Sequence, residues 1–536
     1  MTHRIAVAAG QGVRGTATER KWDVVGEDTG RARASGQEAS GRWAGLVCLS
    51  VGAAMLFVNT AAVNVALPDV SASLNASMAQ QQWVASAYSL AFVVVLLLAG
   101  FGGDRLGHRR VLLMGLVGLL AGSALGVVSP VVGCLIAARA LMGAGAGMFV
   151  PMSLALIADL FPRMADRARA LTVWTIAGTL GAPLGPVIGG GLTSLAGWRA
   201  IFAFDVVAFL VVMAWSLRVI PRSRRPVASA TGLPWRGGLL VTAGLGLLTA
   251  GLINVQRAWM SLSACGSALA GVVLVVLFVV SDLRTGRPLT DLRLFASTPF
   301  AIGGIVLATV NFAVFGLIFV LPAYLETVLG HNALVGGLLL MPLVAGAILG
   351  SLLNERATRR LSPAGACRAG LTLLALGAVI MGAATVRGGL VLMGVGEALA
   401  GLGMGVCQPV ALSWGLSQVD SDRRGTGSSL LSVLQQLGSV LGIGVLGTVE
   451  GSIYSTGLTA SGVHATPEAT SSVTIAFQQA ARSPDAVGQA LREAAARAYT
   501  TATDFSLLTC CLVAVGALTA VMVLVHRGDA RTGPIM

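Results

Sequence analysis

Long apolar runs separated by short polar or basic segments recur along most of this chain. A helix needs about 20 predominantly apolar residues to cross the hydrocarbon core of a bilayer, so runs of this length predict membrane-spanning helices. The pattern predicts fourteen spans, and therefore an all-α polytopic membrane protein. The predicted spans are 44–67, 83–103, 111–129, 132–157, 170–194, 200–219, 237–255, 262–282, 299–325, 333–353, 368–386, 389–415, 425–449 and 503–526.

The connecting segments differ in charge. Those after the even-numbered spans are rich in arginine, whereas the short segments after the odd-numbered spans hold only Arg199, Arg257 and Arg387. Cytoplasmic loops collect Arg and Lys, so we expect both termini in the cytoplasm.

Two longer polar segments stand outside this regular alternation. Residues 1–43 are polar and are expected to form a disordered cytoplasmic tail. Residues 450–502 are expected to form an outer loop, in which the helical spacing over Asp485–Tyr499 predicts a short helix on the outer face. This loop is either a tolerated insertion or a lid that captures substrate.

The chain repeats itself. Arg139 begins a ladder of alternate glycines that recurs after Glu397, 258 residues later; its members are Gly143, Gly145 and Gly147, then Gly401, Gly403 and Gly405. A second string recurs with an offset of 257; it consists of Gly181, Gly185 and Gly190, then Gly438, Gly442 and Gly447. The repeat pairs spans 1–6 with spans 9–14, so the chain consists of two related halves. Secondary transporters with this architecture bind their substrate near the membrane midplane, between the halves.

The repeat also predicts the domain organisation. Two six-helix bundles are expected, joined by a linker that carries two extra spans, with a cytoplasmic tail at each end. The boundaries are 1–43, 44–219, 220–298, 299–526 (which includes the outer loop 450–502) and 527–536.

Composition narrows the possible functions. Hydrophobic residues make up 55% of the 536 and charged residues 11%, and the mean hydropathy is +0.82. The net charge of +13 lies in the arginine-rich loops, so we expect no nucleic-acid partner. The cysteines and histidines lack metal-ligand spacing, and no GxxxxGK[ST] loop is present, so we expect no metal, no cofactor and no direct use of ATP.

A cluster of glycines and charges ends the second span. It comprises Gly100, Asp104, Arg105, Gly107 and Arg109. An acid, a basic cluster and a tight turn at the cytoplasmic end of a span can hold neighbouring helices in one conformational state and release them in another. The alternative is a basic, solvated turn.

The fifth span carries closely spaced small residues and a proline. These are Gly181, Gly185, Pro186, Gly189 and Gly190. Glycine lets helices approach closely and proline bends a helix, so the string predicts a pliable packed contact.

Together these motifs resemble the major facilitator superfamily, and within it the fourteen-span drug:proton antiporters. The second-span cluster resembles that family's cytoplasmic loop signature, the fifth-span string its antiporter motif, and the sequence around Arg139 its fourth-span motif. Further matches include Asn59, Asn64, Tyr88 and Gln435, and the resemblance extends from about residue 44 to residue 526.

The resemblance implies export of drugs or antibiotics by rocking of the two bundles, with Arg139 involved in proton coupling. Three positions depart from the family pattern. Asn59 stands where many relatives have aspartate, Asp205 where asparagine is usual, and Glu326 where glutamine is common. These changes call a standard cation-exporting mechanism into question.

The buried charges suggest a coupling mechanism. Arg139 and Glu397 occupy equivalent spans and are expected to face one another across the central cavity, with Glu397 as the proton-carrying acid that Arg139 modulates. The alternative is a static pair that fixes helix packing. Asp205 is either a third coupling residue or a wetted acid near the membrane surface.

The same cavity is expected to bind the substrate. Asn59, Asn64, Tyr88 and Gln435 are the predicted lining residues, although interhelical hydrogen bonding accounts for the two asparagines equally well.

We therefore expect a monomeric, multi-pass protein of a bacterial cell membrane that exchanges protons for a small amphipathic organic compound, an antibiotic or several drugs. The alternatives are a specific metabolite transporter, a polytopic membrane enzyme or a non-transporting receptor; we expect no enzymatic activity.

Overall fold

The computed structural model describes residues 19–220, 240, 243–244, 246–251, 262–284, 292–387, 389–419 and 424–531, and all regular structure in these ranges is helical. The first half contains α1 (Glu19–Val65), α2 (Leu67–Leu74), α3 (Met78–Leu106), α4 (His108–Val128), α5 (Val132–Leu160), α6 (Met164–Ala196) and α7 (Arg199–Val219). The intervening segment contributes α9 (Leu262–Arg284) and η1 (Leu292–Ala296).

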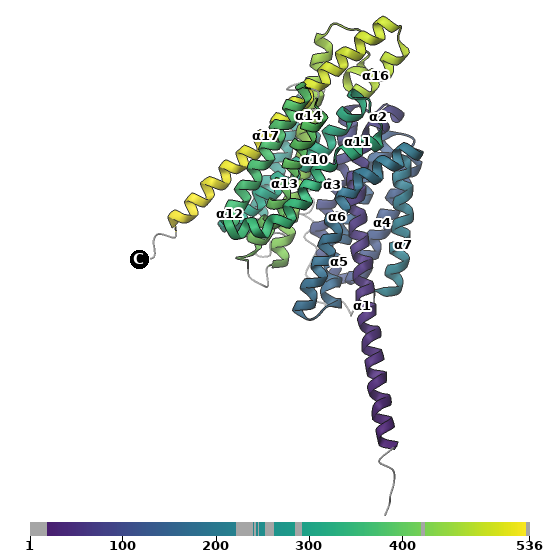
Figure 1. The fold of residues 1–536 in the computed structure, drawn as a ribbon, viewed down its shortest axis with the longest axis vertical. Coiled ribbons are helices and arrows are strands. Elements are labelled where there is room, and N and C mark those ends of the chain that lie inside the picture. Colours follow the sequence, from purple (N-terminus) through teal and green to yellow (C-terminus); the bar gives the residue numbers. More distant parts are fainter. Residues whose placement is uncertain are drawn as a thin grey trace, which may run out of the picture.

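The second half contains the remaining helices. They are α10 (Thr298–Ala323), the π-helix η2 (Tyr324–Val328), α11 (Ala333–Leu339), α12 (Met341–Arg387), α13 (Leu390–Leu416), α14 (Arg424–Ala460), α15 (Pro467–Ser471), α16 (Val473–Arg482) and α17 (Asp485–Arg531). The two halves lie side by side as two bundles (Figure 1).

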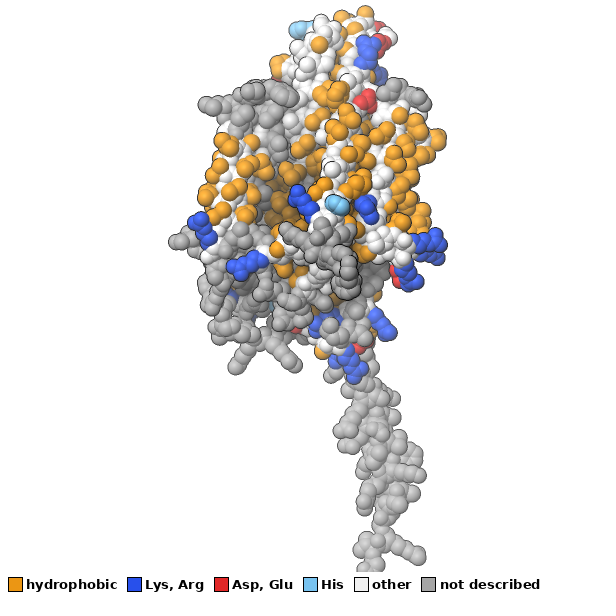
Figure 2. Space-filling model, turned by 90° about the vertical axis from the view of Figure 1, so that its left-hand side faces the viewer, with side chains coloured by type: hydrophobic (Ala, Val, Ile, Leu, Met, Phe, Trp, Pro, Cys, Tyr) orange, Lys and Arg blue, Asp and Glu red, His pale blue; other side chains and the backbone are white. Residues whose placement is uncertain are grey.

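The described part of the chain includes nine helices long and apolar enough to cross a membrane. Large apolar side chains on their outer faces are exposed, for example Val207 and Val211 on α7 and Leu512 on α17. Figure 2 shows such side chains over the middle of one face, with Lys and Arg toward its lower part. The all-α membrane fold is confirmed, whereas the count of fourteen spans is not, because the predicted span 237–255 falls largely outside the described residues.

The repeated glycine ladders pack in the same way in both halves. A Cβ atom at Gly143 would lie 2.1 Å from the carbonyl oxygen of Tyr88 on α3, and one at Gly145 would lie 2.5 Å from a carbonyl oxygen of α4. In the second half, a Cβ atom at Gly401 would lie 1.8 Å from the carbonyl oxygen of Leu343, and one at Gly403 would lie 2.3 Å from a carbonyl oxygen further along α12. Alternate glycines therefore let one helix approach two neighbours at backbone distance.

A break inside α12 separates two of the predicted spans. Ser362 has φ 65° and ψ 163°, outside the helical region, and Pro363 follows it. A residue before proline is disfavoured in the α conformation, so the helix direction changes here. The predicted spans 333–353 and 368–386 lie on either side of this break.

Two predictions about the polar segments need correction. The expected disordered tail, 1–43, is helical from Glu19 onward, because α1 continues without interruption into the first span and extension of an existing helix needs no new nucleus. The helix predicted over Asp485–Tyr499 is present, but it is the first part of the 47-residue α17 and not a separate surface helix. The expected loop is also shortened by α14, which runs to Ala460.

The two halves meet at the end of the molecule that carries α2, α15 and α16, called the cap end below (Figure 1, top). There α3 packs on α14, α6 on α11, and α16 on α2. A Cβ atom at Gly190 would lie 2.4 Å from the carbonyl oxygen of Ala333, and one at Gly337 would lie 2.3 Å from that of Pro186. The backbones of the two halves are thus in direct contact at the cap end.

Candidate functional site

A charged side chain, Arg139 of α5, is fully buried inside the first half. Its Nη1 donates a hydrogen bond of 2.6 Å to Oδ1 of Asn59 on α1, and its Nε donates one of 3.2 Å to the carbonyl oxygen of Val84 on α3. The Asn59 Nδ2 in turn donates to Oδ2 of Asp205 on α7. Asn59 therefore bridges a cation and an acid that come from different helices.

The ring of Tyr88 completes the surroundings of the arginine. The guanidinium carbon of Arg139 lies 4.6 Å from the ring centroid, within the range of a cation–π interaction. Gly143, one turn further along α5, permits the close approach to α3 that brings Arg139 to Tyr88. Removing an arginine from water costs several kcal/mol, and these contacts from α1, α3 and α7 offset that cost.

Glu397 occupies the equivalent place on α13 of the second half and is also fully buried. Neither of its carboxyl oxygens makes a hydrogen bond of standard geometry among the described residues, although the backbone of Leu343 on α12 lies beside the carboxyl group. We expected Arg139 and Glu397 to face one another across the central cavity; among the described residues no hydrogen bond or ion pair joins them, and Arg139 is hydrogen-bonded to Asn59 and Val84 within its own half. The two residues occupy equivalent positions in the two halves, but their described side chains form no polar contact with each other.

Asp205 is buried, with 1% of its surface exposed, so the alternative of a wetted surface acid is wrong. The span position suggested an acid near the boundary, but α1 covers it and the Asn59 amide donates to it. The two departures from the family pattern, Asn59 and Asp205, thus contact one another.

Some buried polar side chains near the predicted cavity have no hydrogen-bond partner among the described residues. Both side-chain polar atoms of Asn64 are buried without a hydrogen-bond partner, as are those of Gln82, which sequence reasoning had not selected as a site residue. Leaving such groups unpaired costs about 1–3 kcal/mol each, so they suit water or a polar group of a bound molecule. Gln435 on α14 is half-buried.

The cluster at the end of the second span ties neighbouring helices of the first half together. Nη2 of Arg109 donates a hydrogen bond of 2.7 Å to the carbonyl oxygen of Leu217 at the end of α7, and Nδ1 of His108 lies 3.1 Å from Oδ2 of Asp159 near the end of α5. Gly107 has φ 89°, which favours glycine at this turn. Arg105 is exposed, and the surroundings of Gly100 and the side chain of Asp104 lie outside the described part.

The small residues of the fifth span, on α6, contact two different helices. Cβ atoms at Gly181, Gly185 and Gly189 would lie within 2.6 Å of α1 atoms, whereas Gly190 and the Pro186 carbonyl face α11 of the other half. This places the string both inside a bundle and on the contact between bundles.

One buried acid escaped the sequence analysis. Glu450 was assigned to the outer loop, yet α14 passes through it and it is fully buried. The sequence does contain a pattern that indicates burial: Leu446, Glu450, Tyr454 and Leu458 recur every four residues. In the structure all four are buried on one face of α14.

Sequence comparison places these features among known proteins. The family model described as Major Facilitator Superfamily matches residues 49–443. The Multidrug resistance protein Stp of Mycobacterium tuberculosis is 32% identical over 406 residues, 75% of each chain. The Probable actinorhodin transporter of Streptomyces coelicolor is 34% identical over 439 residues, 78% of this chain and 74% of that one. Puromycin resistance protein pur8 of Streptomyces alboniger is 30% identical over 447 residues, 82% of this chain and 87% of that one.

Solved structures share the fold. A bacterial homolog to the human lysosomal transporter Spinster has a TM-score of 0.62 at 16% identity and covers 90% of this chain and 98% of its own. The xylose transporter XylE from E. coli has a TM-score of 0.53 at 14% identity and covers 76% of this chain and 91% of its own.

Proposed function

Since this chain belongs to the major facilitator superfamily, we propose that it is a proton-coupled exporter, an antiporter that moves a small amphipathic organic compound out of the cytoplasm. The compound is an antibiotic, or the protein accepts several drugs. The protein acts as a monomer in a bacterial cell membrane, with both termini in the cytoplasm and the cap end outside. It carries out transport and no enzymatic reaction.

The observation that carries this proposal is a set of ionisable groups buried within apolar helices. Arg139 and Asp205 are joined through Asn59 in one half, and Glu397 lies in the other half without a hydrogen bond of standard geometry among the described residues. Burying an uncompensated carboxylate is costly, and binding a proton removes its charge. Glu397 is therefore assigned as the proton-carrying acid. The hydrogen-bonded group of Arg139, Asn59 and Asp205 is assigned as the part of the protein that responds to the charge of Glu397.

The names of the relatives support export of toxic organic compounds. Three are called a multidrug resistance protein, a probable actinorhodin transporter and a puromycin resistance protein. Asn64 and Gln82 supply buried polar atoms for such a substrate, surrounded by apolar side chains. Few polar groups in a mostly apolar site suit ligands that are recognised by shape and apolar contact.

Export itself is tested first. The full chain is expressed in a pump-deficient bacterial host and scored for growth against a panel that includes puromycin and ethidium. The compounds to which it confers resistance are then tested in proteoliposomes that contain a pH-sensitive dye, where each should drive proton movement. Resistance to several unrelated compounds indicates a drug exporter; protection against a single one indicates a specific transporter.

The coupling assignment is tested with Glu397→Gln. We expect the rate of export driven by a pH gradient to fall roughly tenfold or more, while counterflow of the same compound at equal pH persists. Glu355→Gln is the matched control, because Glu355 is 74% exposed and forms an ion pair with Arg359 one turn along the same helix. Undiminished proton-driven export by Glu397→Gln would reject the assignment.

A further inference from the structure

Near the cap end, Glu450 of α14 is a second buried acid in the second half. Its Oε1 accepts a hydrogen bond of 3.3 Å from the hydroxyl of Thr503 on α17, whereas its Oε2 is buried without a partner among the described residues. Tyr499, one turn before Thr503, lies beside the same carboxyl group within reach of a hydrogen bond, although no hydrogen bond of standard geometry reaches Oε2. A buried carboxyl with one unsatisfied oxygen lacks only a proton or a water molecule to complete its hydrogen bonding.

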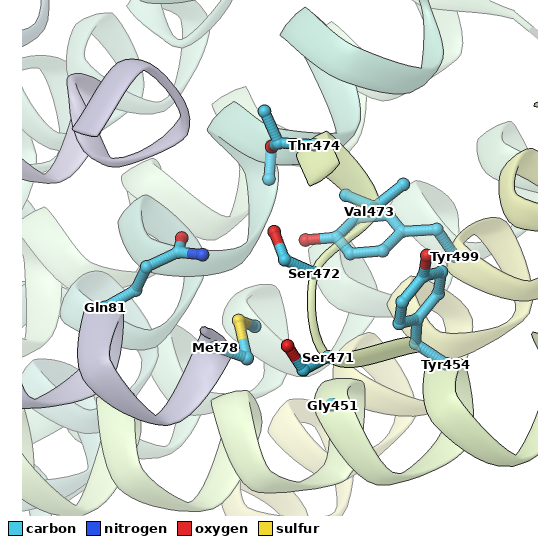
Figure 3. A pocket seen from close by; sticks show the side chains of 10 residues that line it. Met78, Gln81, Gly451, Tyr454, Ser471, Ser472, Val473, Thr474 and Tyr499 are labelled. Atoms are coloured by element: carbon cyan, nitrogen blue, oxygen red, sulfur yellow. The ribbon is translucent and has the colours of Figure 1, made fainter. Parts of the chain in front are cut away.

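A small pocket with a mixed polar and apolar lining lies near this group (Figure 3). Gly451, the next residue in the chain, lines it, and so does Tyr499, whose side chain lies beside the Glu450 carboxyl group and therefore links Glu450 to the pocket. The pocket has room for about one water molecule and not for an organic substrate. Its size suits passage of protons.

The two halves build this pocket together. Met78 and Gln81 come from α3 of the first half, while Ser472 at the start of α16 and the two tyrosines come from the second half. In Figure 3 the Gln81 amide lies on the side opposite Tyr454 and Tyr499. Separation of the halves at the cap end would therefore open the pocket and expose the surroundings of Glu450.

Hydrogen bonds from Ser472 and from α16 to the first half also hold the pocket closed. The hydroxyl groups of Ser472 and Ser71 on α2 lie 2.9 Å apart, and Nε2 of Gln478 donates a hydrogen bond of 3.2 Å to the carbonyl oxygen of Ala72. Ser472 lines the pocket, so these contacts join the second half to the first at its edge.

Few other ionisable groups face Glu450. Tyr499 on α17 and Tyr454 on α14 are titratable neighbours, and the Tyr454 hydroxyl is already donated to the carbonyl oxygen of Ala469. On the adjoining elements, Asp504 of α17 accepts a hydrogen bond from the hydroxyl of Thr385 on α12. Glu468 of α15 is exposed to solvent. The α10 segment contains no charged residue, α3 carries its charges at the opposite end, and the one charged residue of α13 is Glu397.

From this geometry we infer that Glu450 is a second proton-binding site, loaded from the cap end through the pocket that the start of α16 lines. A hydronium ion in the opened pocket gives a proton to the carboxylate, which becomes a neutral acid, and leaves as water; release is the reverse step. The inference rests on the proposed proton coupling and adds to it a route by which protons reach the interior only when the halves separate at the cap end.

The first test measures protonation directly and needs no substrate. Infrared difference spectra of the full chain in liposomes are recorded as the pH is changed between about 5 and about 9. We expect a carboxylic-acid band that is absent in Glu450→Gln, shifted in Glu450→Asp and unchanged in Glu493→Gln. Glu493 is the matched control, because it lies on α17 but is 54% exposed.

The second test measures coupling with a compound already shown to be exported by the wild type. We expect Glu450→Gln to lower the number of protons moved per exported molecule at least about twofold, and Glu450→Asp to restore most of it. A wild type that moves no protons would overturn the proposed function. A coupled wild type whose Glu450→Gln variant keeps the same spectrum and the same proton count would overturn this inference alone.

Discussion

The amide of Asn59 holds together the buried charges of the first half. It accepts from Arg139 and donates to Asp205, so it satisfies a cation and an acid at the same time. An aspartate at this position could accept from the arginine, but as a carboxylate it would repel Asp205. The asparagine at 59 and the acid at 205 are thus complementary, which explains how both departures from the family pattern are tolerated in one protein.

Asn59→Ala tests this role. It leaves Arg139 and Asp205 buried without their common partner, and we expect a loss of about 3 kcal/mol or more of folding free energy. Thermal unfolding in detergent should show a lower melting temperature. Ser123→Ala is the control, because Ser123 is equally buried but its hydroxyl bonds only a carbonyl oxygen of its own helix. Equal melting temperatures for the two variants would contradict the bridging role.

At the scale of elements, the glycine ladders determine how closely the helices of each half pack. α5 and α13 each place alternate glycines against two different neighbours, so each acts as a central helix of its bundle. The ladders were visible in the sequence because they depend on residue type and spacing alone. Which neighbour each glycine contacts was not, because that depends on the path of the chain.

Gly401→Ala tests the close packing of α13. The new methyl group would lie 1.8 Å from the Leu343 carbonyl oxygen, so the helices must separate, and we expect a cost of about 1–3 kcal/mol or more. Gly382→Ala is the matched control, since a Cβ atom there meets no other atom within 4 Å. Both are measured by thermal unfolding. The packing argument fails if Gly401→Ala is as stable as Gly382→Ala.

At the scale of the whole molecule, the described contacts between the halves that involve α2, α6, α11 and α16 lie at the cap end. Alternating access by rocking requires these contacts to break in each cycle. Under the proposed rocking mechanism, the hydrogen bonds of Ser71 with Ser472 and of Ala72 with Gln478 would break and re-form in each cycle.

A disulfide across this contact should stop transport. In Ser71→Cys/Ser472→Cys the two sulfur atoms replace hydroxyl oxygens 2.9 Å apart, a separation from which a small adjustment reaches the bonding distance of about 2.05 Å. We expect oxidation to abolish export in proteoliposomes and reduction to restore it. In the control, the single variant Ser71→Cys carries only one of the two thiols, so no disulfide forms across this contact and oxidation should leave export intact. Full export by the oxidised Ser71–Ser472 variant would argue against rocking at the cap end.

The amino-acid sequence alone was enough to predict the membrane class, the two related halves and the location of Arg139, Asp205 and Glu397 inside apolar helices. These properties follow from hydropathy, spacing and residue type, which are local along the chain. Only the tertiary structure decided that Arg139 bonds to Asn59 and not to Glu397, and that Glu450 lies in the interior. Such outcomes depend on which helix faces and helix ends meet in space, and no pattern along a single helix contains that information.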